Sequence, residues 1–500
     1  MKQTLSGTLM TLVFACALGV SSAHAELDCV WNPGTMSWSN AGVMDRRSEK
    51  PPEFGVDHKG MDRAFGTQIM RLTGPKGSNA LIEADGLTRN NNPWMHFANP
   101  WSRSGDHFIF ESFGRLEGEP NDRYITRIMA LDRASFTVTE RCVIPKTPNG
   151  EALVSQNKSL WFSPDEELLL FGVTSYQAQL WAYNADAKPV TLGTRTLAPG
   201  EFLLLADFAS LVPGTPIACD QGFMWQDGKM FSYGIKERAG KPLGVATWSW
   251  TDDPQKGKTV FISTKDYRTF DEPWCDRKDY VWMAGSNDGN PAHFPDPAAT
   301  GIVRYDRAGA FVDVIRGKGP EVAFAGTGKA CGFDGWWANR NHWEHNRMFL
   351  RKAADVKTFW QIWPPTAQAG AGIKDDALKI GDAWAGNPSF HVRGWVYWAE
   401  YSTGSKADAD FTKTPTTFVG QDEIVAVDVS NPGGVSRFRR ICRLWNDDVD
   451  RSWKYQPDCA ASPGNDYVLY WSNMAAAGED YRRTDSFLAR VVNAKPAPGR

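Results

Sequence analysis

The chain has 500 residues, of which 42% are hydrophobic and 12% aromatic, and its net charge at pH 7 is −3. This much apolar side chain is sufficient for a large core, so the composition excludes an intrinsically disordered protein. A weakly acidic balance disfavours non-specific binding to nucleic acid, and we expect no nucleic-acid partner.

The first 25 residues have the pattern of a secretory signal peptide. Lys2 precedes an apolar stretch over residues 9–20, and Ala23-His24-Ala25 has the small residues of a cleavage site. The apolar stretch is too short to cross a bilayer as a helix, and no other stretch approaches about twenty uninterrupted apolar residues. We therefore expect a periplasmic or secreted protein without a membrane span.

Cysteine usage agrees with export but does not define a disulfide framework. Cys16 lies in the expected signal peptide, which leaves seven cysteines: Cys29, Cys142, Cys219, Cys275, Cys331, Cys442 and Cys459. An odd number leaves at least one thiol free or bound to a metal. Cys442 with Cys459 is one candidate disulfide, although spacing alone does not set the connectivity.

The rest of the chain reads as short β-rich runs separated by Gly, Pro, Asn and Asp, which predicts an all-β protein. The runs group into units of roughly 45 to 65 residues, the pattern of propeller blades. The clearest unit covers residues 159–165, 167–173, 179–184 and 189–194. Including it, we count seven units; the others begin near Pro93, Phe202, Tyr280, Cys331, Asn387 and Gln456.

The last unit supplies only three strands, whereas residues 66–73 form an unassigned strand before the first unit. We expect this early strand to complete the last blade, because closure protects sheet edges. The predicted fold is therefore an all-β, seven-bladed β-propeller over residues 65–493, closed by an N-terminal strand. Residues 26–64 are then an N-terminal extension, and residues 494–500 a flexible tail.

Several short motifs carry a resemblance to a known group of enzymes. They are the strand 66–73, Trp94-Met95-His96, Asn99-Pro100-Trp101-Ser102, Ser163-Pro164-Asp165, and Gln456-Pro457 with Ser462-Pro463-Gly464. With these motifs the chain resembles the β-propeller polysaccharide lyases: oligogalacturonate lyase, the ulvan lyases and rhamnose–glucuronate lyase. The resemblance implies a lyase that cleaves a uronate-containing acidic polysaccharide or oligosaccharide by β-elimination.

Such an elimination needs a cation beside the uronate carboxylate, a base for the C5 proton and an acid for the departing oxygen. The resemblance assigns these roles to His96 as base or carboxylate partner, Tyr176 as acid or base, and Arg195 as the cation. Tyr183 is an equally allowed choice for the tyrosine. We expect a structural role for His107, and each of the other candidates also has a plain structural alternative.

Residues 338–347 are the densest polar cluster in the sequence. We take Arg340 and Arg347 as substrate-binding candidates, and Trp94 and Trp101 as rings on which a sugar could stack. Oligogalacturonate lyases bind a divalent metal through His and Gln, and the resemblance extends this role to four residues here: His342, His345, His391 and Gln456. Zn, Mn or Ca would suit such ligands, but Asp458 or Cys459 replaces the family's His after the terminal Gln-Pro. Direct substrate contact and a solvated polar loop remain open alternatives.

Two other functions stay open. The first is a glycoside hydrolase that uses a pair of carboxylates, since acidic residues are plentiful. The second is a non-catalytic exported propeller that binds a glycan or a protein. In either case we expect a monomer, and for the lyase an acidic polysaccharide as the partner.

Overall fold

The structure is a computed structural model of the whole chain. It describes residues 28–32, 37–39, 50–83, 100–114, 123–153, 160–174, 176–224, 228–238, 240–263, 269–275, 280–287, 291–292, 295, 301–316, 332–333, 336–340, 348–352, 359–363, 383–385, 395–402, 423–429, 437–445, 459–472 and 484–491. Every structural statement below concerns these residues.

Strands dominate the described chain, and its helices are two short 3₁₀ turns, η2 (Ala209–Leu211) and η3 (Pro254–Lys256). The strands are, in order, β1 (Asp28–Asn32), β2 (Ser37–Ser39), β3 (Lys59–Asp62), β4 (Thr67–Arg71), β5 (Thr73–Gly74), β6 (Ile82–Glu83), β7 (His107–Gly114), β8 (Arg123–Asp132), β9 (Thr137–Val143), β10 (Leu160–Phe162), β11 (Leu169–Thr174), β12 (Gln179–Asn184), β13 (Val190–Leu192), β14 (Arg195–Leu197), β15 (Phe202–Asp207), β16 (Ile217–Met224), β17 (Met230–Glu237), β18 (Pro242–Ser249), β19 (Lys258–Ser263), β20 (Thr269–Cys275), β21 (Tyr280–Asn287), β22 (Gly301–Asp306), β23 (Phe311–Arg316), β24 (Gly332–Phe333), β25 (Trp336–Arg340), β26 (Met348–Lys352), β27 (Phe359–Trp363), β28 (Ala383–Ala385), β29 (Trp395–Ser402), β30 (Glu423–Asp428), β31 (Arg437–Arg443), β32 (Cys459–Ala461), β33 (Tyr467–Ser472) and β34 (Asp485–Arg490). The expectation of an all-β protein is confirmed.

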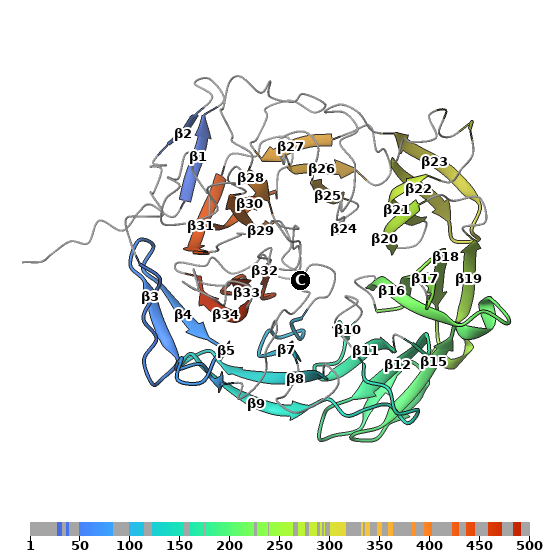
Figure 1. Cartoon of the computed structure of the whole chain (residues 1–500), viewed down its shortest axis with the longest axis horizontal. Coiled ribbons are helices and arrows are strands. Elements are labelled where there is room, and N and C mark those ends of the chain that lie inside the picture. The colour runs from blue at the N-terminus through green and yellow to red at the C-terminus, as the bar shows by residue number, and fades with distance from the viewer. Residues whose placement is uncertain are drawn as a thin grey trace, which may run out of the picture.

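The strands form small antiparallel sheets that follow one another around a common centre (Figure 1). Within the described residues, the sheets of three or more strands are β7-β8-β9, β10-β11-β12-β15, β16-β17-β18-β19, β20-β21-β22-β23, β24-β25-β26-β27, β2-β1-β31-β30-β29-β28 and β3-β4-β34-β33-β32. In most of these sheets, neighbours in the sheet are also neighbours along the chain. Such local pairing needs only short turns, which is why Gly, Pro, Asn and Asp punctuate the sequence so regularly.

Strands from the two ends of the chain share one sheet, as the early strand led us to expect. Met70 of β4 pairs with Leu488 of β34, so blue and red strands lie side by side in Figure 1. In addition, β1 pairs with β31, which attaches part of the expected N-terminal extension to another late sheet. These two pairings join residues more than 400 positions apart in the sequence.

Two expectations about strand order were wrong. Phe202 does not begin a new unit, because β15 is the fourth strand of the sheet β10-β11-β12-β15. The expected fourth strand at 189–194 is instead the start of the hairpin β13–β14, inserted after β12. The inserted hairpin has the same alternating pattern as a sheet strand, and pairing partners cannot be read from that pattern.

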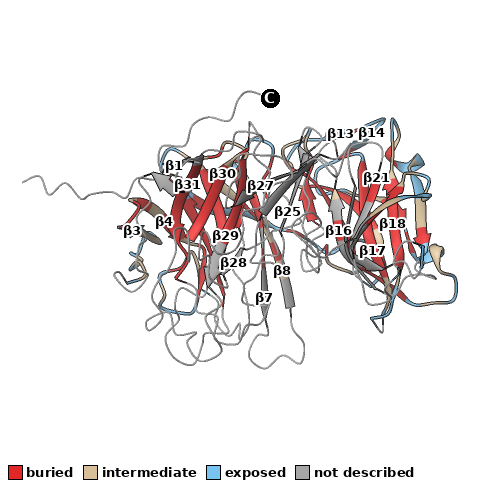
Figure 2. Cartoon of the chain, turned by 90° about the horizontal axis from the view of Figure 1, so that it is seen from above, coloured by how far each residue is buried: buried red, intermediate tan, exposed pale blue. Residues whose placement is uncertain are grey.

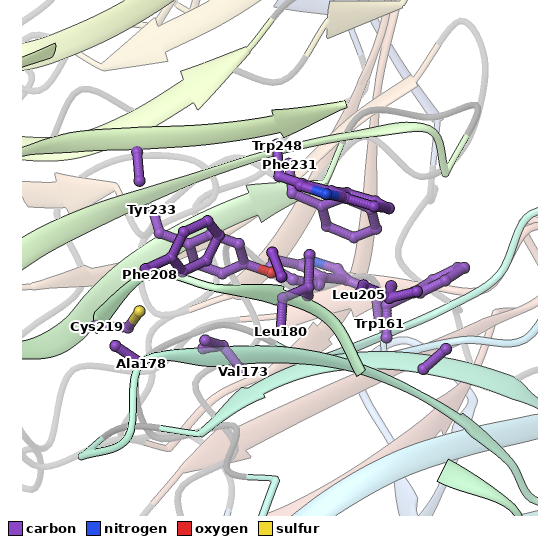
Figure 3. Close-up of a cluster of buried hydrophobic side chains, with 14 of the residues drawn as sticks. Trp161, Val173, Ala178, Leu180, Leu205, Phe208, Cys219, Phe231, Tyr233 and Trp248 are labelled. Carbon is purple, nitrogen blue, oxygen red and sulfur yellow. The ribbon is translucent and has the colours of Figure 1, made fainter. Parts of the chain in front are cut away.

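The sheets pack through buried aromatic and aliphatic faces (Figure 2). Between the second and third sheets, Phe231 contacts Trp161, Phe171 and Trp248 at ring-centroid distances of 5.9, 5.2 and 5.8 Å. These residues belong to one buried cluster that also contains Ala178 and Cys219, and Figure 3 shows Trp161, Phe231 and Trp248 within it. Each fully buried large side chain contributes about 1.5–3 kcal/mol, so this cluster holds the second and third sheets together.

Four of the cysteines that the structure describes form no disulfide: Cys142, Cys219, Cys442 and Cys459. Cys442 and Cys459 lie in the same buried cluster, but they are not joined to each other. The candidate disulfide Cys442–Cys459 is therefore wrong. No helix of the described chain has the length and apolar character needed to span a membrane.

Candidate functional site

Successive sheets share one orientation, so the turns at the two ends of the sheets lie on two distinct faces. The turn before β7 contacts the turn before β11, because the His107 and Glu167 side chains are 3.0 Å apart. Gly228, before β17, lies against Pro164 in that same turn. We call this end of the sheets the Glu167 face. The opposite end, where β11 is followed by residues 176–178, is the Tyr176 face.

Tyr176 projects from a tight turn at the start of β12. Its side chain is 62% exposed, which is unusual for a residue of this size. The turn closes through a hydrogen bond from the Ala178 amide to the Thr174 carbonyl at 3.1 Å, and Ala178 has a positive φ of 53°. The Ala178 methyl group is fully buried in the cluster of Figure 3. The buried Ala178 therefore fixes the turn to the core, while the Tyr176 side chain is exposed to solvent.

Arg238 is the cationic neighbour of Tyr176. It follows β17 in the third sheet, as Tyr176 follows β11 in the second. Its guanidinium Nη2 donates to the Tyr176 carbonyl oxygen at 2.6 Å, and its guanidinium carbon is 6.0 Å from the centre of the tyrosine ring. Among the described residues these are the contacts of its side chain. An arginine has five N–H donors, so Arg238 keeps donors for an anionic ligand.

A loop from the preceding sheet holds the tyrosine turn from the other side. The Glu151 carboxylate accepts the amide N–H of Gln177 at 3.1 Å, and the Gln177 side chain donates to the Asn149 carbonyl at 3.1 Å. Asn149 in turn donates to Gln179 at 2.7 Å. Tyr176 and Arg238 are therefore an exposed pair on a turn that is fixed on two sides.

The Glu167 face carries a denser but more enclosed network. Glu167 accepts hydrogen bonds from the hydroxyl of Ser102, from the hydroxyl and amide of Ser104 at 2.5 and 3.0 Å, and from Nδ1 of His107 at 3.0 Å. Burial alone would raise the pKa of Glu167, but the bonds from His107 and the two serines outweigh it and lower the pKa to about 2. The carboxylate therefore stays ionised and joins the first two sheets.

Arg133 extends this network to the last sheet. Its guanidinium donates to Asp106 at 2.7 Å and to Asp466 at 2.6 Å. Asp466 also accepts from the hydroxyl of Ser462 at 2.7 Å. These groups are hydrogen-bonded to one another across three sheets, so the network has a structural role. The structural role expected for His107 agrees with its place there.

Replacing Glu167 by Ala should lower the free energy of unfolding by about 2 kcal/mol, because several partly buried donors lose their acceptor. The folded-state pKa lies below the ordinary 4.5, so the carboxylate stabilises the fold above that value and loses its effect as the pH falls towards about 2. Urea unfolding at several pH values measures both effects. Glu166→Ala is the control, since the Glu166 side chain makes no hydrogen bond within the described chain; an equal loss in both variants would contradict the prediction.

The structure does not bring Arg195 to Tyr176. Arg195 begins β14, and its side chain pairs with Asp253 at 3.6 Å. The hairpin β13–β14 lies beside residues 250–253 at the Glu167 face. The arginine beside Tyr176 is therefore Arg238 and not the expected Arg195.

Trp101 is a core residue. It is 1% exposed, and its indole N–H donates to the Ala460 carbonyl at 3.0 Å, so no face of this ring is open to a sugar. Tyr183, the alternative tyrosine, is also buried and stacks on Phe202 at a ring distance of 4.4 Å. Of the two tyrosines, Tyr176 alone is accessible.

The other expected site residues cannot be placed. Arg340 is the last residue of β25, and only its backbone is described. Seven lie outside the described residues: His96, Trp94, Arg347, His342, His345, His391 and Gln456.

The metal expectation rests on residues outside the described ranges. Within those ranges, no group of three or more His, Cys, Asp or Glu side chains is arranged to hold a metal ion.

Arg238 is the residue that the sequence analysis missed. A signal was available, since Tyr176 and Arg238 each follow the second strand of successive sheets. It was obscured because Phe202 was taken as the start of the third unit, whereas the third sheet begins with β16.

Comparison with known proteins gives distant structural similarity. No family model and no curated protein matches the chain. Solved structures similar to it include an oligogalacturonate lyase in complex with manganese, with 12% identity, a TM-score of 0.49, and coverage of 91% of this chain and 99% of that one. A prolyl endopeptidase has 12% identity, a TM-score of 0.37, and coverage of 74% and 45%. An aldose sugar dehydrogenase from Streptomyces coelicolor has 12% identity, a TM-score of 0.31, and coverage of 65% and 91%. Similarity at this level does not transfer an activity.

Proposed function

We propose that the protein is a polysaccharide lyase that cleaves a uronate-containing chain by β-elimination on the Tyr176 face of a seven-bladed propeller. The observation that carries the proposal is the exposed Tyr176 with the Arg238 guanidinium beside it. A hydroxyl that can exchange a proton and a cation with free donors are two of the three groups that such an elimination needs.

In the proposed reaction, Arg238 binds the uronate carboxylate and disperses the negative charge that grows as the C5 proton leaves. His96 is proposed as the base that takes this proton. The C5–H electron pair forms the C4=C5 double bond, and the C4–O bond breaks. Tyr176 gives its proton to the departing oxygen; His96 then releases the C5 proton to water and Tyr176 regains one from water, so no proton is gained or lost overall. The products are one unsaturated uronate end and one new hydroxyl end.

The test is a screen of uronate polysaccharides with the full-length protein. A lyase produces a conjugated unsaturated uronate, which absorbs at about 235 nm, together with new chain ends. New reducing ends without this absorbance would contradict the lyase and indicate a hydrolase with a carboxylate pair. Binding without any new ends would contradict both and indicate a non-catalytic propeller.

The same screen tests the metal. Protein treated with a chelator and then supplied with Mn, Zn or Ca separates two cases. An activity unchanged by chelation means that the chain's own residues suffice, whereas loss and recovery would support a divalent metal bound by His342, His345, His391 or Gln456.

A further inference from the structure

The hairpin β3–β4 is fastened to the neighbouring sheet by a buried carboxylate. The Asp62 side chain is fully buried, and it accepts the Arg443 amide N–H of β31 at 2.8 Å and the Ala64 amide N–H at 3.0 Å. Close by, the Thr67 hydroxyl donates to the Ile441 carbonyl. Since β4 also pairs with β34, this hairpin connects the early part of the chain with two late sheets.

Few charges compensate Asp62 in the seam between the β3–β4 hairpin and β31, which we call the seam below. Arg443 of β31 is the cation beside it, and the neutral groups that face it are the Cys442 thiol of β31 and the Tyr470 hydroxyl of β33. Burial raises the pKa of the Asp62 carboxyl to about 6, against the lowering effect of the Arg443 amide and guanidinium.

The other buried charges of the seam are already paired. Arg440 of β31 forms an ion pair with Glu423 of β30, and both side chains are 1% exposed. Arg440 also lies over the ring of Phe65, in the turn that follows Asp62, at 4.9 Å. The guanidinium carbon of Arg439 lies 5.1 Å from the ring centre of Trp395, so this cation contacts that ring.

An exposed copy of the same turn shows the effect of burial. The sequence Asp-Arg-Ala occurs at residues 62–64, 132–134 and 306–308, and Asp132 of the second copy is exposed. Asp132 likewise accepts amide N–H groups two and three residues later, from Ala134 at 2.9 Å and Ser135 at 3.3 Å. There the bonds from Ser135 lower the pKa of the carboxyl. The turn itself thus favours the ionised form, and burial in the seam reverses the preference.

We propose that the β3–β4 hairpin is a proton-sensitive clasp: a protonated Asp62 holds the N-terminal hairpin tightly against β31 in mildly acidic solution, and ionisation loosens it towards neutral pH. The sign follows from linkage. The closed seam binds the proton more tightly than an open one, so stability is present at low pH and is lost as the pH rises through the folded-state value.

Hydrogen exchange of the full-length protein tests the clasp. After correction for intrinsic exchange, peptides covering residues 59–71 and 437–443 should lose protection on the order of a hundredfold between pH 4 and pH 7.5, with a midpoint near 6. Asp62→Asn should remove this dependence. Asp132→Asn, the exposed copy, and His58→Asn, the histidine of the same hairpin, should behave like the wild type.

Three results would overturn the proposal: equal wild-type protection at both pH values, a midpoint that moves in His58→Asn, or a slope that survives in Asp62→Asn. If Asp62→Asn does not fold, hydrogen exchange of the wild type and of Thr67→Val tests the proposal instead. This variant keeps the carboxyl but loses the bond to Ile441. Thr67→Val should lower protection at both pH values but keep the wild-type ratio of protection at pH 4 to protection at pH 7.5. A ratio near one would refute the clasp.

Discussion

Tyr176→Phe is expected to lower kcat for formation of the unsaturated product by at least about a hundredfold, since general acid catalysis contributes 10²–10⁴-fold. The phenylalanine ring can still pack under the Arg238 guanidinium, and the hydrogen bond from Arg238 goes to the backbone carbonyl. Substrate binding and the melting temperature should therefore change little. Steady-state kinetics at 235 nm and thermal unfolding measure the two effects.

Tyr183→Phe is the matched control for this variant. Tyr183 is 6% exposed, packs on Phe202 and lies at the other end of β12. Its hydroxyl should be dispensable for turnover. Full activity in Tyr176→Phe, or an equal loss in Tyr183→Phe, would remove Tyr176 from the reaction.

Arg238→Ala is expected to lower kcat/KM by about 10²–10³-fold, because in the proposed reaction the uronate carboxylate and the charge growing beside it lose their cation. Part of the loss should appear in KM, since the carboxylate is present before the reaction begins. Arg238→Lys should recover only part of the activity, because a lysine lacks the planar fork of donors.

Arg195→Ala separates this assignment from the one expected from sequence. Arg195 is 48% exposed and forms a single surface ion pair with Asp253 at 3.6 Å. Its loss should change the free energy of unfolding by less than about 1 kcal/mol and leave kcat/KM within about twofold of the wild type. If Arg195→Ala were the inactive variant and Arg238→Ala the active one, the Tyr176 face would not be the site.

The local elements of this fold were predictable from sequence. The strands β11 and β12 fall within about two residues of the expected ranges, because apolar runs and turn residues mark each strand and its end. The early strand that joins the last sheet was also predictable, because the last unit supplied only three strands and the strand at residues 66–73 belonged to no other unit. The hairpin β13–β14 was not, because its residues have the pattern of a sheet strand but pair only with each other.

Half of the candidate site was predictable in the same sense. Tyr176 stands between two recognisable strands, so its place in an exposed turn followed from turn chemistry. Its cationic partner did not follow, because Arg195 is nearer in sequence than Arg238 but lies at the other end of the sheet. Likewise, the motif around Trp101 was recognisable, but its burial was not.

The sequence by itself determined that the chain forms short antiparallel strands and that an early strand pairs with the last ones. These depend on local propensity, on alternation and on the number of strands in each unit. The tertiary structure decided which arginine meets Tyr176, which aromatic rings are buried and which of the three Asp-Arg-Ala segments is buried against β31. Those outcomes depend on how neighbouring sheets pack, and packing brings together residues whose separation along the chain carries no information about their distance in space.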